Sequence, residues 1–579
     1  MPILLYDKET TGAQKQDIKF GQALEVHASR VVRDSFEPGS DLKITESLAK
    51  DRDVIRCSLR PHTLYDPEAL IVNGIELSEV RPRYNPAKGP SRIPLADRLY
   101  TNYEMNLAFE NFVWRLSKHT RMYTGGYNTS EFDERVREQG RFQNLIPNTD
   151  DADFRVHIDI LKFVRAAAHV YPDRFIIPKS STDPDKRTFK QTEFAKANGI
   201  DMDEDKAHGA RYDVDHLTFE IARLIRLRAP KVWDTMMTHA DYQAMRKMVE
   251  ENHGGIYYYV DTKFNELKAE PVYIFWPMPR PNSHHPRPQV LAINLGQSLT
   301  KFLKRHDITS LHQLIEEASK RPGPNNPLRM IDLRKNPFLV PLKGFKSHFG
   351  VDPYLKIKPE LLDERLKQIR GAGKFIDGPL YEAALKWELP KKLKNGDPVE
   401  DFVHGDLTTE KRPLTHHARS KMLREEAAEE SLLHRFHNES ENWQERAEIM
   451  RQLQNPIHTE FALRLVGEHD FDALTPIEQR RYVNFLHLRL VGQKNKKMPW
   501  PTFDSVEKKI EKKLKDKKLP DAHRTAYEKM LVDHREWRRE FMEFYDGWRN
   551  RTAPERPGRY QKQRFEYQHN GEKTVTLTV

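Results

Sequence analysis

Residues Pro271–Leu295 read PVYIFWPMPRPNSHHPRPQVLAINL and join two apolar runs through a proline-dense bridge near the middle of the chain. Five prolines fall within Pro277–Pro288. Each fixes φ and removes a backbone donor, so we expect a stiff, extended connector rather than helix or central strand. The flanks Val272–Trp276 and Val290–Leu295, and the earlier run Ile256–Val260, are rich in β-branched and aromatic residues. They predict a small central sheet with mainly helical sequence on both sides.

The composition points to a large, polar protein of more than one module. The chain has 579 residues, several times the usual domain length. Only 37% of residues are hydrophobic, 31% are charged, and the mean hydropathy is -0.79, so much of the surface must be solvated or meet polar partners. The net charge of +10 is concentrated in residues 491–579 and 251–350. A localised basic surface fits a polyanion partner, although a generally basic protein would show the same excess.

The cysteine content excludes a protein stabilised by internal disulfides, and the hydropathy excludes a membrane-spanning protein. The single cysteine, Cys57, excludes an internal disulfide framework and a cysteine-based metal site. No window approaches the roughly 18 to 20 apolar residues of a membrane span. The first residues, MPILLYDKETTG, resemble neither a secretory signal nor a transit peptide.

The N-terminal half is expected to be helical with β-hairpins. Asn73-Gly74 between two apolar runs predicts a type I′ hairpin over Ala69–Glu79. The proline-rich and basic stretch Val80–Pro94 is predicted to be an extended arm that contacts partners. The apolar spacing predicts helices over Gln22–Ser35, Leu95–His119, Ala152–Tyr171, Asp213–Arg228 and Lys231–Glu251.

The C-terminal half is expected to be an irregular helical array. Residues Pro322–Pro359 are predicted to form a second extended, partner-contacting arm, after a short helical pair over Gln297–His306 and Ser310–Arg321. Thr475, Pro476 and Glu478 form a helix start signal with a capping box. The predicted helices are Pro359–Arg370, Thr415–His437, Glu439–Gln454, Ile457–Val466, Pro476–Val491, Ser505–Leu519 and Asp521–Arg549. The tail ends in TVTLTV, an expected edge strand that needs a partner.

These patterns together predict an α+β fold that is predominantly α-helical, with long extended arms. We divide the chain into an N-terminal arm with a β-hairpin (1–94), a helical module ending in the small sheet (95–276), a Pro-rich basic bridge with short helices (277–358), a C-terminal helical module (359–551) and a basic aromatic tail (552–579).

A search for catalytic motifs gives no positive signal. There is no phosphate-binding glycine loop, since Gly125 and Gly126 are expected to be turn glycines, and there is no H-E-x-x-H motif and no G-x-S-x-G elbow. The adjacent pairs His284-His285 and His416-His417 diverge on regular structure and favour solvent contact over metal ligation. Asp213 and Asp215, beside His216, are explained by helix capping and the macrodipole. We therefore predict no catalytic residue, no metal ligand and no cofactor, and a protein that is not an enzyme.

The positive signal is basic charge near the C-terminus. Seven lysines within Lys508–Lys518 surround one narrow apolar seam, and four arginines accompany the aromatic stripe of the following helix. The aromatic stripe indicates core packing, and a merely solvated lysine helix remains the alternative to a polyanion-facing one. The predicted nucleic-acid-binding residues are Lys508, Lys509, Lys512, Lys513, Lys515, Lys517, Lys518, Arg535, Arg538, Arg539 and Arg549.

These features favour a non-catalytic structural subunit of a large assembly. The first hypothesis is a mitochondrial ribosome protein that contacts RNA and neighbouring protein subunits, because basic surface and extended arms suit a protein lying across RNA. The alternative is a peripheral accessory subunit of a protein-only complex, such as the respiratory chain, ATP synthase or a cytoskeletal array. A third hypothesis is an enzyme whose site these motifs do not reveal. The expected location is mitochondrial, or otherwise cytoplasmic.

Overall fold

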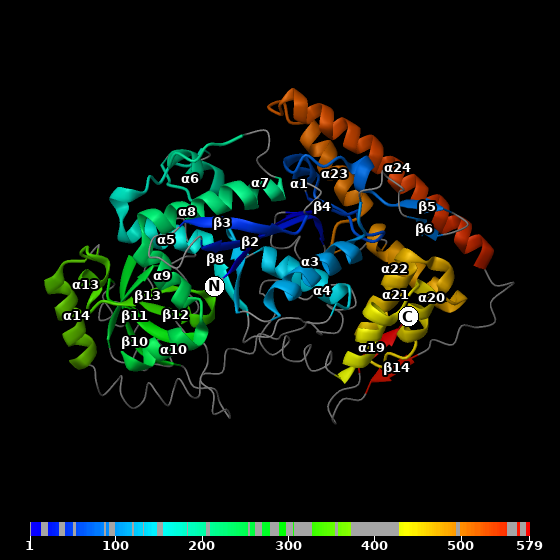
Figure 1. Ribbon diagram of the computed structural model, residues 1–579. Helices are drawn as coiled ribbons and strands as arrows, with labels where there is room; N and C mark the ends of the chain where they lie inside the picture. Colours follow the sequence, from blue (N-terminus) through cyan, green and yellow to red (C-terminus); the bar gives the residue numbers. More distant parts are fainter. Residues whose placement is uncertain are drawn as a thin grey trace.

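The computed structural model arranges the elements in an arc around a central sheet (Figure 1). The sheet and the first helices lie in the middle, the second sheet lies at one end, and the C-terminal helices lie at the other. The structure describes residues 2–12, 21–33, 41–49, 54–85, 89–91, 99–118, 121–130, 132–146, 155–181, 183, 185–203, 209–252, 255–260, 269–277, 289–296, 305, 327–353, 357–371, 428–493, 498, 500–552, 564–567 and 575–578.

The central sheet has six strands in the order β3-β2-β1-β7-β8, with β4 pairing β2. β1 is antiparallel to β2 and parallel to β7, and β7 is parallel to β8. β1 and β2 are buried almost throughout because helices cover both faces of the sheet, and the buried residues include polar and charged ones such as Lys8, Glu25 and His27. The strands are β1 (Ile3–Thr10), β2 (Ala23–Arg33), β3 (Leu42–Ser47), β4 (Ile55–Arg56), β7 (Met122–Gly126) and β8 (Arg155–Asp159).

Two helical layers cover the central sheet. One core packs α3 (Asn102–Ser117) and α4 (Asp133–Gln143) against residues such as Leu4, Tyr6 and Val26. The other core joins the opposite face, represented by Ile3 and Leu5, to α5 (Ile160–Val170), α8 (Phe219–Arg228) and α9 (Pro230–His239). The chain is thus a three-layer α/β/α sandwich at its centre.

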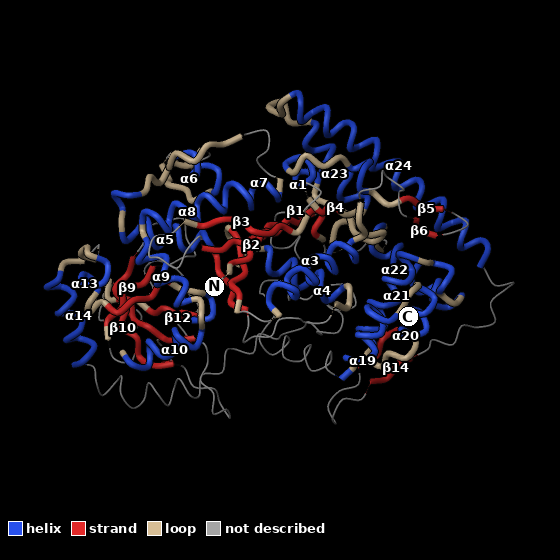
Figure 2. The backbone as a smooth tube through the Cα atoms, in the orientation of Figure 1, coloured by secondary structure: helices blue, strands red, loops and turns tan. Residues whose placement is uncertain are grey.

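The second sheet confirms the prediction made from the proline-flanked runs (Figure 2). Its order is β12-β11-β10-β9-β13, and all its pairs are antiparallel. α10 (Tyr242–Glu251) packs on it. The strands are β9 (Ile256–Val260), β10 (Ala269–Pro277), β11 (Gln289–Asn294), β12 (Leu328–Asp332) and β13 (Phe338–Pro341). Residues 278–288 of the predicted bridge and nearly all of the predicted helical pair over 297–321 lie outside the described residues.

The C-terminal helices form the array that the sequence predicts. Thr475 and Glu478 exchange both hydrogen bonds of the expected capping box. The aromatic stripe of the last helix is core, because Trp537, Phe541 and Phe544 are fully buried. The helices are α19 (Glu430–His434), η5 (Arg435–Glu439), α20 (Trp443–Met450), α21 (Pro456–His469), α22 (Pro476–Leu490), α23 (Phe503–Leu514) and α24 (Asp521–Thr552).

Shorter elements complete the described chain. They are α1 (Pro67–Val72), α2 (Leu77–Val80), β5 (Arg83–Asn85), β6 (Gly89–Ser91), η2 (Pro172–Arg174), α6 (Gln191–Ala197), α7 (Ala210–Tyr212), η3 (Asp213–Thr218), η4 (Leu333–Lys335), α13 (Phe345–Phe349), α14 (Pro359–Gly371), η6 (Phe471–Ala473), β14 (Arg564–Tyr567) and β15 (Val575–Thr578). β15 pairs with β14, which supplies the partner expected for the final strand.

Three local predictions for the N-terminal half are wrong. The expected helix Gln22–Ser35 is strand β2, because pairing with β1 and β3 outweighs a weak helical stripe. The expected hairpin Ala69–Glu79 is the pair α1 and α2, because Asp66 caps a helix that begins at Pro67. Gly125 and Gly126 are strand residues rather than turn residues.

The described parts of the two predicted arms pack on the protein itself, so the prediction is wrong for those parts. Within Val80–Pro94, Arg81 is fully buried and pairs with Glu536 and Glu540 of α24, at 2.6 and 3.0 Å. Within Pro322–Pro359, Phe338 and Phe345 are buried in the core that joins the two sheets. The prolines in these segments therefore separate short elements that pack on the protein's own core.

The chain is α+β with more helix than strand, as predicted. The finer expectation of a helical N-terminal module with β-hairpins is wrong, since the N-terminal segment builds the central sheet. Within the described ranges no helix is long and apolar enough to cross a membrane. The domain boundaries stay a prediction.

Candidate metal centre

Asp7 and Glu9 lie near the end of β1, where the apolar residues 3–6 give way to charged ones. Residues two apart on a strand share one face, so both carboxyl groups point the same way. Both side chains are half-buried. Lys8, between them, is buried on the opposite face with its ammonium 4.6 Å from the centre of the Phe109 ring. Burial lowers the pKa of Lys8 to about 8.

A helix from a distant part of the chain brings Asp213 to the same place. α7 runs into the π-helical turn η3, which begins at Asp213. The Ala210 N–H donates a 3.0 Å hydrogen bond to Oε1 of Glu25. Glu25 stands opposite Glu9 in the β1–β2 register. The start of this helix is therefore fixed beside the acidic end of β1.

Asp215 holds the same turn against β2. Its Oδ1 accepts a 2.5 Å hydrogen bond from Ser29 Oγ, and its Oδ2 lies 3.0 Å from Nε2 of His27. Ser29 and His27 are fully buried, so the anchor is rigid. The turn η3 has no side-chain N-cap, and the capping interpretation of Asp213 and Asp215 is wrong.

Carboxylate oxygens of Asp7, Glu9 and Asp213 lie within 4.8 Å of one another. Hard divalent cations such as Mg²⁺ and Mn²⁺ prefer this ligand type, several carboxylates around one point. Three like charges at this spacing repel one another unless a cation or a proton intervenes. The donor set therefore fits a divalent cation.

The pKa values of Asp7 and Glu9 are raised, as expected for carboxyl groups that repel one another. Burial, then the charges of Asp133, Glu9 and Asp213, raise the pKa of Asp7 well above its usual value. Burial, then the charges of Asp213, Glu25 and Asp133, do the same for Glu9. Each group keeps a proton at a pH where an isolated carboxyl would have lost it. A cation bound here would displace those protons.

Asp133 is the fourth acidic residue of the cluster. It opens α4, and burial raises its pKa to about 8 against the lowering effect of the Lys8 ammonium. Asp133 also raises the pKa values of Asp7 and Glu9, so it lies within electrostatic range of both. The acidic cluster is thus formed by two residues of one strand and one from each of two helices.

The loop before Asp133 is shaped by close contacts at the sheet. A Cβ at Gly126 would lie 2.3 Å from the Tyr6 carbonyl oxygen, and one at Gly125 would lie 1.9 Å from that of Ile158. Only glycine allows β7 to fit between β1 and β8 there. Asp159 accepts hydrogen bonds from the Asn128 and Ser130 N–H groups, at 2.9 and 3.3 Å. These contacts fix the loop that leads to α4.

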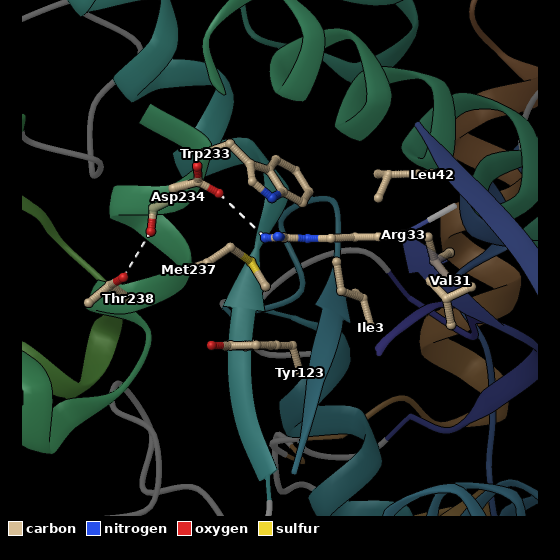
Figure 3. A pocket seen from close by; sticks show the side chains of 10 residues that line it. Ile3, Val31, Arg33, Leu42, Tyr123, Trp233, Asp234, Met237 and Thr238 are labelled. Atoms are coloured by element: carbon tan, nitrogen blue, oxygen red, sulfur yellow. Dashed lines mark hydrogen bonds and ion pairs between the residues drawn. The ribbon is translucent and has the colours of Figure 1, made fainter. Parts of the chain in front are cut away.

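A cavity of about 240 Å³ lies at the other end of the central sheet (Figure 3). Its wall includes Ile3, where β1 begins, whereas Asp7 and Glu9 lie toward the far end of that strand. Its charged groups, Arg33 and Asp234, are paired at 3.4 Å and drawn facing each other in Figure 3. The cavity brings together no cluster of carboxylates and is separate from the candidate metal centre.

The residues predicted to bind nucleic acid lie on α23, on the turn that follows it and on α24, and about half of them pair with carboxylates of the protein. The pairs are Lys509 with Asp66 (2.6 Å), Lys513 with Glu68 (3.1 Å), Arg535 with Glu507 (2.6 Å), Arg538 with Asp504 (2.8 Å) and Arg539 with Glu543 (3.1 Å). The exposed remainder comprises Lys508, Lys512, Lys515, Lys517, Lys518 and Arg549. None of the eleven contributes a ligand to the acidic cluster.

Asp7, Glu9 and Asp133 were not predicted as site residues, and Asp213 was explained as a helix cap, because the four residues come from three distant segments. One signal was available: an apolar run at the N-terminus that ends in Asp-x-Glu, a pair that shares a strand face. Asp213 and Asp133 open helices, where acidic residues are common without any function. Only the fold distinguishes them from caps.

No protein-family model matches the sequence. Exodeoxyribonuclease I of Escherichia coli (strain K12) is 22% identical over 298 residues, which cover 50% of this chain and 56% of that protein. The chain thus matches about half the length of that curated relative.

Solved structures of exonuclease I share the fold over nearly the whole chain. Exonuclease I from Methylocaldum szegediense superposes with a TM-score of 0.65 at 18% identity, covering 93% of this chain and 99% of that one. E. coli exonuclease I in complex with a dA16 oligonucleotide gives 0.63 at 16% identity with the same coverage. The ExoI/SSB-Ct complex gives 0.59 at 16% identity, covering 96% and 99%. At these identities the likeness establishes the exonuclease I fold.

These findings correct the functional predictions. A chain with the exonuclease I fold and a sequence match to a DNA-degrading enzyme is not a structural ribosomal subunit, so the first hypothesis is wrong. The protein-only accessory subunit and the prediction that the chain is not an enzyme are wrong for the same reason. The mitochondrial location was inferred from the ribosomal hypothesis, which no longer supports it. The location stays an untested prediction.

Proposed function

We propose that the chain is a divalent-metal-dependent exonuclease that degrades single-stranded DNA. The observation that carries the proposal is the convergence of Asp7, Glu9 and Asp213 within 4.8 Å at the end of the central strand. The exonuclease I fold supports it, as does the presence of oligonucleotides in complexes of that enzyme. The 22% identical relative supports DNA rather than RNA as the substrate.

The acidic residues have distinct tasks in this proposal. Asp7, Glu9 and Asp213 hold the cation, and Asp133 completes the negative surface. When bound, the cation lowers the pKa of a coordinated water and neutralises charge on the phosphodiester. Burial of Ser29 and His27 beneath Asp215 keeps Asp213 in place, so the site is organised before substrate arrives. The chain's own role is to place oxygen ligands and to give up protons to solvent when the cation enters.

The exposed lysines of α23 fit a binding path for the DNA backbone. Asp66 links the two regions: its N–H donates to the Thr11 carbonyl just after β1, and its carboxylate pairs with Lys509 of α23. The basic helix is therefore tied to the loop that follows the acidic strand. Lysines act here as point charges on phosphates and read no sequence, which suits an enzyme that moves along a strand.

Degradation of labelled oligonucleotides tests the proposal. The full chain is incubated with 5′-labelled and 3′-labelled single-stranded DNA, the matching duplex and the matching RNA, with Mg²⁺, Mn²⁺ or EDTA. We expect stepwise shortening of single-stranded DNA with either cation and none with EDTA, and the two labels reveal the end that is attacked. Endonucleolytic fragments, or activity that persists in EDTA, would contradict the proposal.

Two variants connect the activity to the site. Asp7→Asn keeps the shape of the side chain but removes a cation ligand, so we expect activity to fall by roughly 10²-fold or more. Asp472→Asn is the matched control, because Asp472 is exposed on η6 in the C-terminal module. Equal activities of the two variants would show that the nuclease site lies elsewhere.

A further inference from the structure

A group of buried arginines joins the N-terminal segment to the C-terminal helices, away from the acidic cluster. Arg60, between β4 and α1, is 1% exposed. Arg464 of α21 and Arg489 of α22 are 2% and 3% exposed. α21 and α22 lie together at the C-terminal end of the arc (Figure 1). Guanidinium groups stay charged in proteins, so three positive charges lie in the interior.

The contacts between these groups place them around one interior point. Arg464 stacks on the Phe485 ring at 3.9 Å, and His62 packs on the same ring at 5.1 Å. Arg60 donates from Nε to Glu468 Oε2 at 2.9 Å. Glu468 lies one helical turn beyond Arg464 on α21, so Arg60 and Arg464 meet the same helix face. The Arg60 charge in turn lowers the pKa of Arg464, after burial, to about 9.

The contacts of Arg60 and Arg464 in the described part of the chain do not balance the positive charges of these two residues. Among the described residues, Glu468 is the carboxylate that contacts Arg60, and no carboxylate contributes to the pKa of Arg464. Burial, then Arg60, Arg489 and Arg464, lower the pKa of His62 well below its usual value, so His62 is neutral. An uncompensated buried guanidinium is costly unless a counter-charge enters with it.

Several hydrogen-bond donors of the cluster have no partner in the described part of the chain. They are Nη1 and Nη2 of Arg60, Nε and Nη2 of Arg464, and the Tyr482 hydroxyl. Tyr482 is fully buried and lies within electrostatic range of both arginines. Buried donors are almost always satisfied in folded proteins, so donors from three segments with no acceptor indicate an absent acceptor.

We propose that Arg60, Arg464 and Tyr482 form a buried binding site for a small inorganic anion, which links the N-terminal segment to α21 and α22. The anion accepts the unsatisfied guanidinium and hydroxyl hydrogens and supplies the missing negative charge. Chloride and phosphate share this chemistry, and the site serves cohesion between the two parts rather than the nuclease reaction.

Thermal unfolding of the full chain in different sodium salts at one ionic strength tests the site. Gluconate is too large to enter a buried cluster, so it provides the reference. In chloride or phosphate we expect the wild-type midpoint to rise by about 3 °C or more, because a ligand that binds only the folded state stabilises it. A response to chloride identifies a halide site, and a response to phosphate alone identifies an oxyanion site. Equal midpoints in all three salts would overturn the proposal.

Two variants separate a specific site from a general salt effect. Arg464→Met replaces the guanidinium that stacks on Phe485 with an uncharged thioether of similar length and leaves Glu468 paired with Arg60. We expect it to lose the anion response and to be at least as stable as wild type in gluconate. Arg549→Met, at an exposed position on α24, is the control that keeps the response. An unchanged response in Arg464→Met would contradict the proposal.

Two further measurements remain informative if Arg464→Met fails to fold. Tyr482→Phe keeps the ring that packs against Gly467 and removes only the hydroxyl donor, so we expect a several-fold weaker anion dependence of the midpoint. If chloride raises the midpoint, crystals of the wild type grown in sodium bromide should show a bromine anomalous peak between Arg60 and Arg464; if phosphate alone raises it, crystals soaked in sodium selenate should show a selenium peak there. Peaks confined to the surface would overturn the assignment.

Discussion

The carboxylate of Asp215 accepts a 2.5 Å hydrogen bond from the Ser29 hydroxyl, across a separation of 186 residues in sequence. This bond ties the helix that carries Asp213 to the strand beside Asp7 and Glu9. The candidate metal centre therefore depends on a residue that supplies no ligand itself.

The first prediction concerns this anchor. Asp215→Asn should weaken cation binding, because an amide cannot accept from both Ser29 and His27 with the strength of a carboxylate. Loss of such a supporting contact costs roughly 10- to 100-fold in metal affinity or activity. The Mg²⁺ concentration for half-maximal nuclease activity should rise, with recovery at high Mg²⁺. Activity that is lost equally at every Mg²⁺ concentration would assign Asp215 another role.

The second prediction concerns pH. The pKa values of Asp7 and Glu9 are raised, and burial raises that of Asp133 to about 8. Groups whose folded pKa is raised lose their contribution to stability as pH increases, so in EDTA the unfolding temperature should fall between about pH 5 and pH 8. Mg²⁺ should reverse this fall, because it favours the deprotonated carboxylates.

Proton release measures the same linkage directly. Calorimetric titration of Mg²⁺ in two buffers with different ionisation enthalpies should reveal protons released on binding near pH 7. Asp7→Asn should release fewer. Binding with no proton release at this pH would mean that the carboxyl groups are already ionised.

The third prediction concerns α23. Replacing Lys508, Lys512 and Lys515 with glutamine should weaken single-stranded DNA binding about equally for unrelated sequences, and should reduce the slope of log affinity against log salt by roughly two. Exposed substitutions of this kind change stability by no more than about 0.5 kcal/mol. A fluorescence anisotropy titration across salt concentrations measures the slope. An unchanged slope would leave these lysines as solvated surface.

The fourth prediction concerns the docked proline-rich segment. Arg81→Ala removes a fully buried guanidinium that pairs with Glu536 and Glu540 and leaves Arg83 as the remaining partner of Glu540, so we expect a loss of about 2 kcal/mol in unfolding free energy. Limited proteolysis should cut residues near 81–85 early in this variant and late in wild type. Arg539→Ala, whose pair with Glu543 is exposed, is the control and should behave as wild type.

Early cleavage in the wild type would show instead that the segment is an unattached arm. The sequence predicts such an arm, because four prolines and four basic residues between 80 and 94 offer little to bury. The buried guanidinium of Arg81 and the buried ring of Tyr84 provide that burial through pairing and aromatic contact with α24.

Local patterns in the sequence determined several elements of this protein. β9, β10 and β11 were predicted from β-branched runs beside prolines, and α22 from the capping box of Thr475 and Glu478. The signals for these elements lie within a few neighbouring residues, so the elements can be recognised without knowledge of the fold. The aromatic stripe of α24 was predicted as core for the same reason.

Tertiary structure alone decided the central sheet and the acidic site. β2 carries a weak helical stripe, and only pairing with β1 and β3 makes it a strand. Asp7 and Asp213 are more than two hundred residues apart, and each has an ordinary local explanation as a surface acid or a first-turn acid. Hydrogen bonds to Glu25 and Ser29 of β2 hold the helix that carries Asp213 against the strand that carries Asp7. The two carboxyl groups are then close together and partly buried, so they repel each other. This proximity is a property of the fold.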